Sequence, residues 1–141
     1  MNQASPTTNS GPGYASHSDH KIELLPAARR VRVEFGGETV ADSTNARLIR
    51  ENTYPLVYYF PRDDVRMEVL SATEHTSYCP FKGEASYWSV GVGDRSVENA
   101  VWGYPTPYDE VSELKDFVSF YWDKMDAWYE DEKRVIKPSS L

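Results

Sequence analysis

The chain has 141 residues and a formal net charge of -7 at pH 7, because 22 Asp and Glu outnumber 15 Lys and Arg. This length suits a single domain that folds without disulfides, and an acidic chain is a poor partner for nucleic-acid phosphates. Aromatic residues make up 13% of the sequence, which is typical of a packed globule rather than of a disordered chain. No apolar run reaches membrane-spanning length.

The two ends of the chain differ in composition from the rest. Residues 1–19 are rich in Ser, Thr, Asn, Pro and Gly, and we expect them to form a disordered tail without the apolar segment of a secretory signal. Residues 20–136 form the expected single β domain, and residues 137–141 are expected to be flexible. We therefore expect a soluble, cytoplasmic protein with neither a nucleic-acid nor a membrane partner.

The firmest structural prediction is a hairpin near the start of the domain. Short strands begin at Ile22, and residues 31–35 alternate Val and Phe with Arg and Glu, which is the period-two pattern of a half-buried strand. Gly36 and Gly37 follow at once, and residues 39–41 resume an extended pattern. Two glycines between such runs predict a tight turn of the primed type.

The middle of the chain is predicted to hold one short helix and several strands. Residues 42–45 supply N-capping side chains, so residues 46–51 are predicted to form a helical turn or two. Strands are predicted over residues 56–60, 65–70 and 85–92, with a further aromatic segment over residues 99–104.

The C-terminal third allows two interpretations. Residues 109–115 favour a short helix, and Val111, Leu114 and Val118 follow a helical three-four spacing. With period two, Val118 lies instead on a strand that turns at Asp123 and Lys124 into a partner strand. Aromatic and β-branched residues favour strands, so we expect a short helix followed by a hairpin over residues 117–130, with a longer helix as the alternative.

These elements together predict the fold class. Few helical segments separate the strands, which argues against parallel βαβ winding. We therefore expect a mainly β fold of two antiparallel sheets packed face to face, with one or two short helices.

The segment 76–88 holds the best candidates for a site, because the single cysteine, a lysine and two large aromatics lie near a proline turn. Lys82 and the amides of this turn could activate Cys79 as a nucleophile, with His75 as its base. Free cysteine is more often a buried packing residue, so these three residues are catalytic candidates only. One cysteine forms neither an internal disulfide nor a thiolate zinc site, and we expect no metal and no cofactor.

Other reactive residues have plainer explanations. Asp63 and Asp64 are adjacent on an extended segment, so they point to opposite sides, and neighbouring arginines can neutralise them. We therefore predict an ion-paired turn there rather than a metal site. His17 and His20 lie near the expected tail and are interpreted as incidental rather than as metal ligands.

Four motifs resemble those of one known family. They are residues 30–43, residues 58–65, residues 76–83 with Tyr87-Trp88, and residues 99–102. Their order and content are similar to the domain of unknown function 427 family over residues 20–135, a family sometimes labelled nucleotidyltransferase-like. The resemblance implies a β-tent-like fold, in which two sheets lean together around a pocket. Relatives of the β-tent often carry a zinc clamp of paired cysteines, which this chain should lack because it has only Cys79.

The transferase label implies more than the residues support. Nucleotidyl transfer of this kind needs a glycine turn followed by two carboxylates one residue apart, which hold metal ions against the triphosphate. Gly36-Gly37 resembles the turn, but Asp42 is followed by Ser43 and Thr44. The residues therefore disagree with the label.

The leading hypothesis is that a small-molecule ligand binds in a pocket between the two sheets. Its predicted binding residues combine aromatic walls with polar contacts, and they are Arg47, Glu51, Tyr58, Thr76, Lys82, Trp88 and Trp102. The first alternative is an enzyme that uses Cys79 or the carboxylates, including nucleotidyl transfer. The second is a protein-interaction module with an exposed patch of Trp122, Trp128 and Tyr129.

Overall fold

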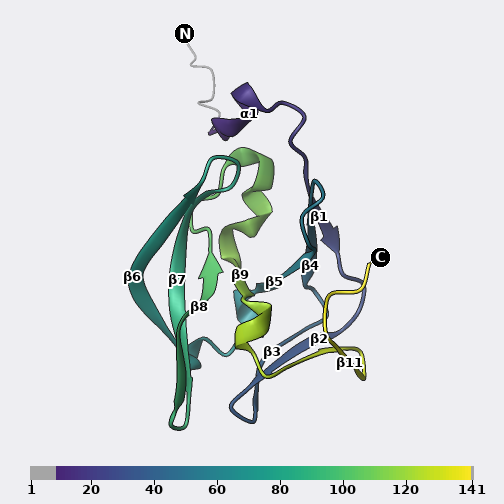
Figure 1. Cartoon of the computed structure of the whole chain (residues 1–141), viewed down its shortest axis with the longest axis vertical. Coiled ribbons are helices and arrows are strands. Elements are labelled where there is room, and N and C mark those ends of the chain that lie inside the picture. The colour runs from purple at the N-terminus through teal and green to yellow at the C-terminus, as the bar shows by residue number, and fades with distance from the viewer. Residues whose placement is uncertain (1–8, 141) are drawn as a thin grey trace.

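The computed structural model describes residues 9–140, and short antiparallel strands dominate it (Figure 1). In chain order the elements are α1 (Gly13–Ser16), β1 (Ile22–Pro26), β2 (Val31–Phe35), β3 (Glu38–Ser43), β4 (Arg47–Glu51), β5 (Val57–Pro61), η1 (Arg62–Asp64), η2 (Met67–Val69), β6 (Leu70–Cys79), β7 (Gly83–Val92), β8 (Arg95–Gly103), η3 (Asp109–Asp116), β9 (Phe117–Phe120), η4 (Trp122–Lys124), β10 (Ala127–Glu130) and β11 (Lys133–Val135). The η elements are 3₁₀ turns. The expected mainly β, antiparallel fold of two sheets with short helices is confirmed.

The larger sheet has seven strands in the order β1-β4-β5-β9-β8-β7-β6, and the smaller has four in the order β11-β10-β2-β3. Figure 1 shows that the larger sheet is strongly bent, with β1 and β4 on one side of the molecule and β6, β7 and β8 on the other. We call β1 and β4 the first wing and β6, β7 and β8 the second wing. Strands β5 and β9 join the two wings.

The β2–β3 hairpin is confirmed. Gly36 and Gly37 have φ values of +62° and +83°, and positive φ at both central residues is the requirement of a type I′ turn. A Cβ at Gly36 would lie 2.9 Å from the Cβ of Val92. The turn therefore needs glycine at Gly36 both for its backbone conformation and for its close approach to β7.

The two faces of the larger sheet bury two different apolar cores. On β5, Tyr58 and Phe60 belong to the core between the sheets, whereas Tyr59 belongs to a second core on the other face. On β4, Leu48 and Ile49 separate in the same way. Successive side chains of a strand point to opposite faces, so these strands are buried on both sides. The first core lies between the two sheets.

The prediction of a helix over residues 46–51 is wrong, because this segment is strand β4. All five of its residues pair with β1, and three also pair with β5. Pairing on both edges and burial on both faces outweigh the local helix signal. Ser43, one of the four expected capping residues, instead donates its hydroxyl to Asp64 at 2.6 Å and accepts the Asn45 amide at 2.9 Å.

The prediction of a strand over residues 65–70 is also largely wrong. The turn η1 ends just before this stretch, η2 occupies residues 67–69 within it, and β6 begins only at Leu70. Val65 makes one isolated bridge with Ala41, and the Arg66 amide donates to the Val40 carbonyl at 2.9 Å. Val65 and Met67 nevertheless pack on the core between the sheets. The apolar alternation of this segment therefore reflects burial and not strand pairing.

The C-terminal third contains the expected short helical segment, η3, followed by the strands β9 and β10. These strands do not pair with each other, so the predicted hairpin between them is wrong. Strand β9 lies between β5 and β8 in the larger sheet, whereas β10 pairs with β2 and β11 in the smaller one. The chain crosses between sheets at η4, where Trp122 stacks on Trp128 with ring centroids 4.0 Å apart.

Both end segments of the described chain contact the domain. The Gly13 amide donates to the Pro80 carbonyl at 3.0 Å, and the Tyr14 ring packs edge-on against Phe81. At the other end, the Ser139 amide and hydroxyl donate to the carboxylate of Glu130. Residues 1–8 and 141, which the predicted tail and flexible end include, lie outside the described residues.

Candidate functional site

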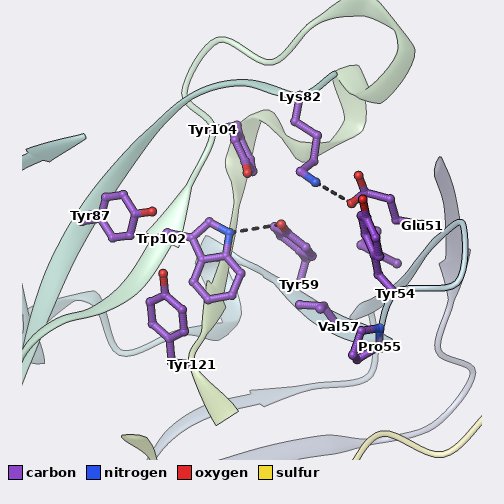
Figure 2. Close-up of a pocket in the computed structure, with 11 residues that line it drawn as sticks. Glu51, Tyr54, Pro55, Val57, Tyr59, Lys82, Tyr87, Trp102, Tyr104 and Tyr121 are labelled. Atoms are coloured by element: carbon purple, nitrogen blue, oxygen red, sulfur yellow. Dashed lines mark hydrogen bonds and ion pairs between the residues drawn. The ribbon is translucent and has the colours of Figure 1, made fainter. Parts of the chain in front are cut away.

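A pocket of about 360 Å³ lies between the two wings of the larger sheet (Figure 2). It is on the face of the larger sheet that carries the second core, whereas the first core lies on the other face, toward the smaller sheet. Its lining residues are Ile49, Glu51, Tyr54, Pro55, Val57, Tyr59, Lys82, Tyr87, Trp102, Tyr104 and Tyr121.

Strand alternation positions the side chains of the first wing and of β5. Ile49 and Glu51 are two residues apart on β4, and Val57 and Tyr59 are two residues apart on β5. Residues at this separation project from the same face of a sheet. The four side chains therefore form one continuous wall that is apolar at Ile49 and Val57 and polar at Glu51.

Lys82 comes from the turn between β6 and β7. Its amide donates to the Cys79 carbonyl at 3.3 Å, and its carbonyl accepts the Tyr108 amide at 3.0 Å. The next residue, Gly83, has a φ of +121°, and a Cβ there would lie 3.2 Å from the Thr106 carbonyl oxygen. Glycine is therefore required at this turn, which fixes the backbone of Lys82 and directs its side chain across the pocket.

Glu51 is bound on both of its carboxylate oxygens. The Lys82 Nζ lies 2.6 Å from Oε1, and the Nε2 of His20 lies 2.8 Å from Oε2. The His20 ring stacks on Phe81 with centroids 3.6 Å apart. The Lys82, Glu51 and His20 side chains are 12%, 13% and 8% exposed. This polar cluster thus lies at the edge of the pocket, largely withdrawn from solvent.

The opposite wall is aromatic. The Trp102 indole nitrogen donates to the Tyr59 hydroxyl at 3.1 Å, and Tyr121 packs against Trp102 with centroids 4.6 Å apart. Burial raises the pKa of Tyr59 and of Tyr104. Burial and the neighbouring Tyr87 hydroxyl raise the pKa of Tyr121 to about 12. These phenols stay protonated at neutral pH, so each hydroxyl is able to donate a hydrogen bond.

Comparison with known protein families identifies the family of this chain. The family model described as Domain of unknown function (DUF427) matches residues 23–131, more than half of the chain. The chain belongs to this family. The DUF427 match contains every strand from β2 to β10 and all the lining residues of the pocket. A search of curated proteins finds no match. Among residues 9–140, no helix is long and apolar enough to cross a membrane.

The structure of this DUF427 protein brings together three of the predicted ligand-binding residues, namely Glu51, Lys82 and Trp102. Two others lie on the right strands but face away from the pocket. Tyr58 donates its hydroxyl to Glu130 at 2.5 Å, and Trp88 packs against the core between the sheets.

The remaining two predicted ligand-binding residues lie elsewhere on the larger sheet. The Nε of Arg47 is 3.3 Å from a carboxylate oxygen of Glu113, and its guanidinium lies over the Phe117 ring. Thr76 is exposed on β6, opposite Ser86 of β7. Neither residue lines the pocket.

The catalytic candidates are not assembled. His75 and Cys79 are both on β6, and four residues of extended strand span about 13 Å, which is too far for proton transfer between them. His75 instead packs edge-on against Tyr87, and Cys79 packs against the second core. The Lys82 ammonium, the third candidate, is bound to Glu51.

The carboxylates of the transferase hypothesis are also dispersed. Asp42 is bound by the guanidinium of Arg30 at 2.6 Å, whereas Asp64 accepts the Ser43 hydroxyl. Among residues 9–140, no group of three or more His, Cys, Asp and Glu side chains is arranged to hold a metal ion.

Sequence reasoning missed His20 of the polar cluster. It also missed five tyrosines that line the pocket, namely Tyr54, Tyr59, Tyr87, Tyr104 and Tyr121. Tyr59 and Tyr87 immediately adjoin the predicted Tyr58 and Trp88, so a signal was present but the strand face was misassigned. His20 carries no such signal, because its contact with Glu51 depends on the pairing of β1 with β4.

Proposed function

We propose that this DUF427-family protein binds a small polar molecule with a flat ring in the pocket between the two wings. The observation that supports this proposal best is the combination of six aromatic side chains with a partly buried Lys82–Glu51 ion pair around one space of about 360 Å³. Ligand sites of this size are typically apolar and aromatic, with a few polar groups that orient the ligand.

The Lys82–Glu51 ion pair favours a binding role for these two residues over a purely structural one. Removing two charges from water costs free energy that their mutual attraction often fails to recover, so apolar residues would stabilise the same position equally well. The wall also contains five tyrosines, at Tyr54, Tyr59, Tyr87, Tyr104 and Tyr121, together with the indole of Trp102. Flat rings that carry polar groups at their edges are the natural complement to such walls.

The interaction-module hypothesis has less support. Trp128 is only 2% exposed because it packs between the sheets and stacks on Trp122. Tyr129 lies beneath the Arg32 guanidinium, 4.5 Å from the ring centroid. The three aromatic residues therefore do not form the exposed patch that this hypothesis requires.

The enzyme hypothesis lacks an assembled set of residues, since the thiol and its expected base lie far apart and the carboxylates bind other partners. We therefore propose ligand binding rather than nucleotidyl transfer. On the sequence evidence of acidic charge and a single cysteine, we keep a cytoplasmic location and the absence of nucleic-acid and membrane partners as part of this proposal.

A thermal-shift screen against nucleosides, nucleotides, cyclic imides, sugars and divalent metals tests the proposal. A compound at one hundred times its dissociation constant adds about 2.7 kcal/mol of stability, which raises the melting temperature of a domain this size by several degrees. Hits are then titrated against Tyr54→Ala, which removes a pocket ring that is 57% exposed, and against Tyr78→Ala as a control. Tyr78 is 58% exposed and lies outside the pocket.

We expect Tyr54→Ala to weaken binding and Tyr78→Ala to leave it unchanged. Equal weakening by both variants would place the ligand elsewhere. A hit that requires magnesium, or no hit in the whole panel, would count against the pocket-binding proposal.

A further inference from the structure

Some of the hydrogen-bonding groups around the pocket are already engaged with one another, whereas others remain available to a ligand. Glu51 is the only carboxylate among the lining residues, and its two oxygens already accept from Lys82 and His20. The pocket therefore offers a ligand no unpaired carboxylate. Its other polar groups are the Lys82 ammonium, which only donates, and tyrosine hydroxyls, which donate and accept. The protonation state of His20 decides whether the polar cluster carries a net charge.

The hydrogen-bond network fixes the protonation of His20. The Lys21 amide donates to Oδ1 of Asn52 at 2.9 Å, which leaves the Asn52 amide nitrogen facing Nδ1 of His20, also at 2.9 Å. Because an amide nitrogen only donates, Nδ1 must be the acceptor. The proton is therefore on Nε2, which donates to Glu51. A neutral His20, an ionised Glu51 and a protonated Lys82 carry no net charge together.

The free donors converge. Figure 2 shows the Lys82 ammonium and the hydroxyls of Tyr59 and Tyr104 directed toward the same part of the pocket. Tyr59 accepts the indole N–H of Trp102, so its own proton points elsewhere. A hydrogen bond between the Tyr59 and Tyr104 hydroxyls uses one of their two protons and leaves the other free. At least one phenol proton and two ammonium protons are therefore available to a ligand.

We propose that the pocket binds an uncharged ring compound through a carbonyl oxygen, which accepts hydrogen bonds from Lys82 and Tyr104. This inference rests on the proposed function, because it specifies the ligand of the same pocket. A carboxylate would bring a second negative charge close to Glu51, with no further cation among the lining residues to balance it. An ammonium group would find both oxygens of Glu51 engaged and would bring a second positive charge close to the Lys82 ammonium.

Three probes of matched size test the ligand class, and they are acetophenone, benzoate and benzylammonium. The full chain is titrated with each at neutral pH, and binding is followed by the indole N–H signals in ¹H–¹⁵N NMR spectra. The Trp102 signal is assigned from its loss in Trp102→Phe. We expect acetophenone to bind about tenfold more tightly than either ion, the ratio that one unfavourable buried polar contact produces.

The variant Tyr104→Phe removes one donor and keeps the ring, so it separates the carbonyl contact from packing. We expect it to weaken acetophenone binding about threefold to tenfold and to leave benzylammonium unaffected. Lys82→Met should abolish the preference for the carbonyl probe, and Lys21→Met, which changes an exposed lysine outside the pocket, should retain it.

The outcomes separate this inference from the proposed function. Equal or tighter binding of either ion at the Trp102 signal would overturn the inference and leave pocket binding in place. An unchanged acetophenone affinity in both Tyr104→Phe and Lys82→Met would also overturn it. If none of the probes shifts the Trp102 signal up to its solubility limit and the thermal-shift screen finds no ligand, the proposed function fails and the inference fails with it.

Discussion

The Nζ of Lys82 lies 2.6 Å from Oε1 of Glu51, although the two residues are 31 positions apart in the sequence. Glu51 ends β4 in the first wing, and Lys82 lies in the turn that begins β7 in the second wing. The ion pair therefore connects the two wings directly across the edge of the pocket (Figure 2). This contact makes the stability of the bent sheet and the shape of the pocket depend on the same two side chains.

Replacing Lys82 by Met should destabilise the fold. The variant leaves Glu51 bound only to His20 in a site where the carboxylate is 13% exposed, and an unpaired charge in such a site is costly. We expect the free energy of unfolding to fall by about 2 kcal/mol, measured by urea denaturation at neutral pH.

Lys21→Met is the matched control for this prediction. Lys21 is 73% exposed and lies 3.9 Å from Glu23, so its loss should cost less than about 0.5 kcal/mol. Equal losses of stability in the two variants would mean that the pair between the wings contributes no more than an ordinary surface pair.

Ser139→Ala should reduce stability in a pH-dependent manner. Burial alone would raise the pKa of Glu130, but the hydrogen bonds from Ser139 and Tyr58 and the charge of Arg29 outweigh burial and lower it. A carboxyl with a lowered pKa in the folded state stabilises the protein above its unfolded pKa of about 4.3, and this contribution disappears as the pH falls through the folded value.

We therefore expect Ser139→Ala to cost about 1.5 kcal/mol at neutral pH, and the difference from the parent protein to shrink as the pH is lowered below about 4. Urea denaturation over this pH range measures it. Ser140→Ala is the control, because Ser140 contributes only its carbonyl to Arg29. A difference from the parent that stays constant with pH would show that the Ser139 hydroxyl does not act through the ionised carboxylate of Glu130.

Gly83→Ala should destabilise the turn that carries Lys82. A φ of +121° is unfavourable for any residue with a Cβ, and the added atom would lie 3.2 Å from the Thr106 carbonyl. We expect a loss of about 2 kcal/mol or more by thermal or urea denaturation. Gly91→Ala in the same strand should be nearly neutral, because the nearest atom to its new Cβ is 3.9 Å away. Similar effects of the two changes would exclude turn strain as the cause.

The sequence predicts the fold class and the local turns well, because these depend on short-range patterns. The β2–β3 hairpin follows from alternation and from two glycines that need positive φ. The helix predicted at 46–51 failed for a long-range reason, since the strand character of this segment comes from pairing with β1 and β5. The same applies to β9 and β10, which belong to different sheets although the residues of the two strands carry no local signal of this difference.

The candidate site could be predicted as a region but not as a set of side chains. Tyr58 and Tyr59 are adjacent aromatic residues on a strand buried on both faces, and so composition does not reveal which of them lines a pocket. The same ambiguity separates Tyr87 from Trp88. In both strands, neighbouring residues face different cores, so an error of one position assigns a side chain to the wrong core. Only the position of the smaller sheet, which covers Tyr58 and Trp88, resolves the choice.

The buried hydroxyl of Tyr59 provides a last prediction, because it joins the second core to the aromatic wall. Tyr59→Phe would leave the indole N–H of Trp102 without its 3.1 Å acceptor, and a buried donor without a partner costs about 1 kcal/mol or more. We expect a loss of stability of that size and an upfield shift of the Trp102 indole proton. The indole of Trp128, which donates to the Trp122 carbonyl, is an internal control and should keep its position. An unchanged Trp102 signal would mean that this indole has another acceptor and that Tyr59 does not organise the aromatic wall.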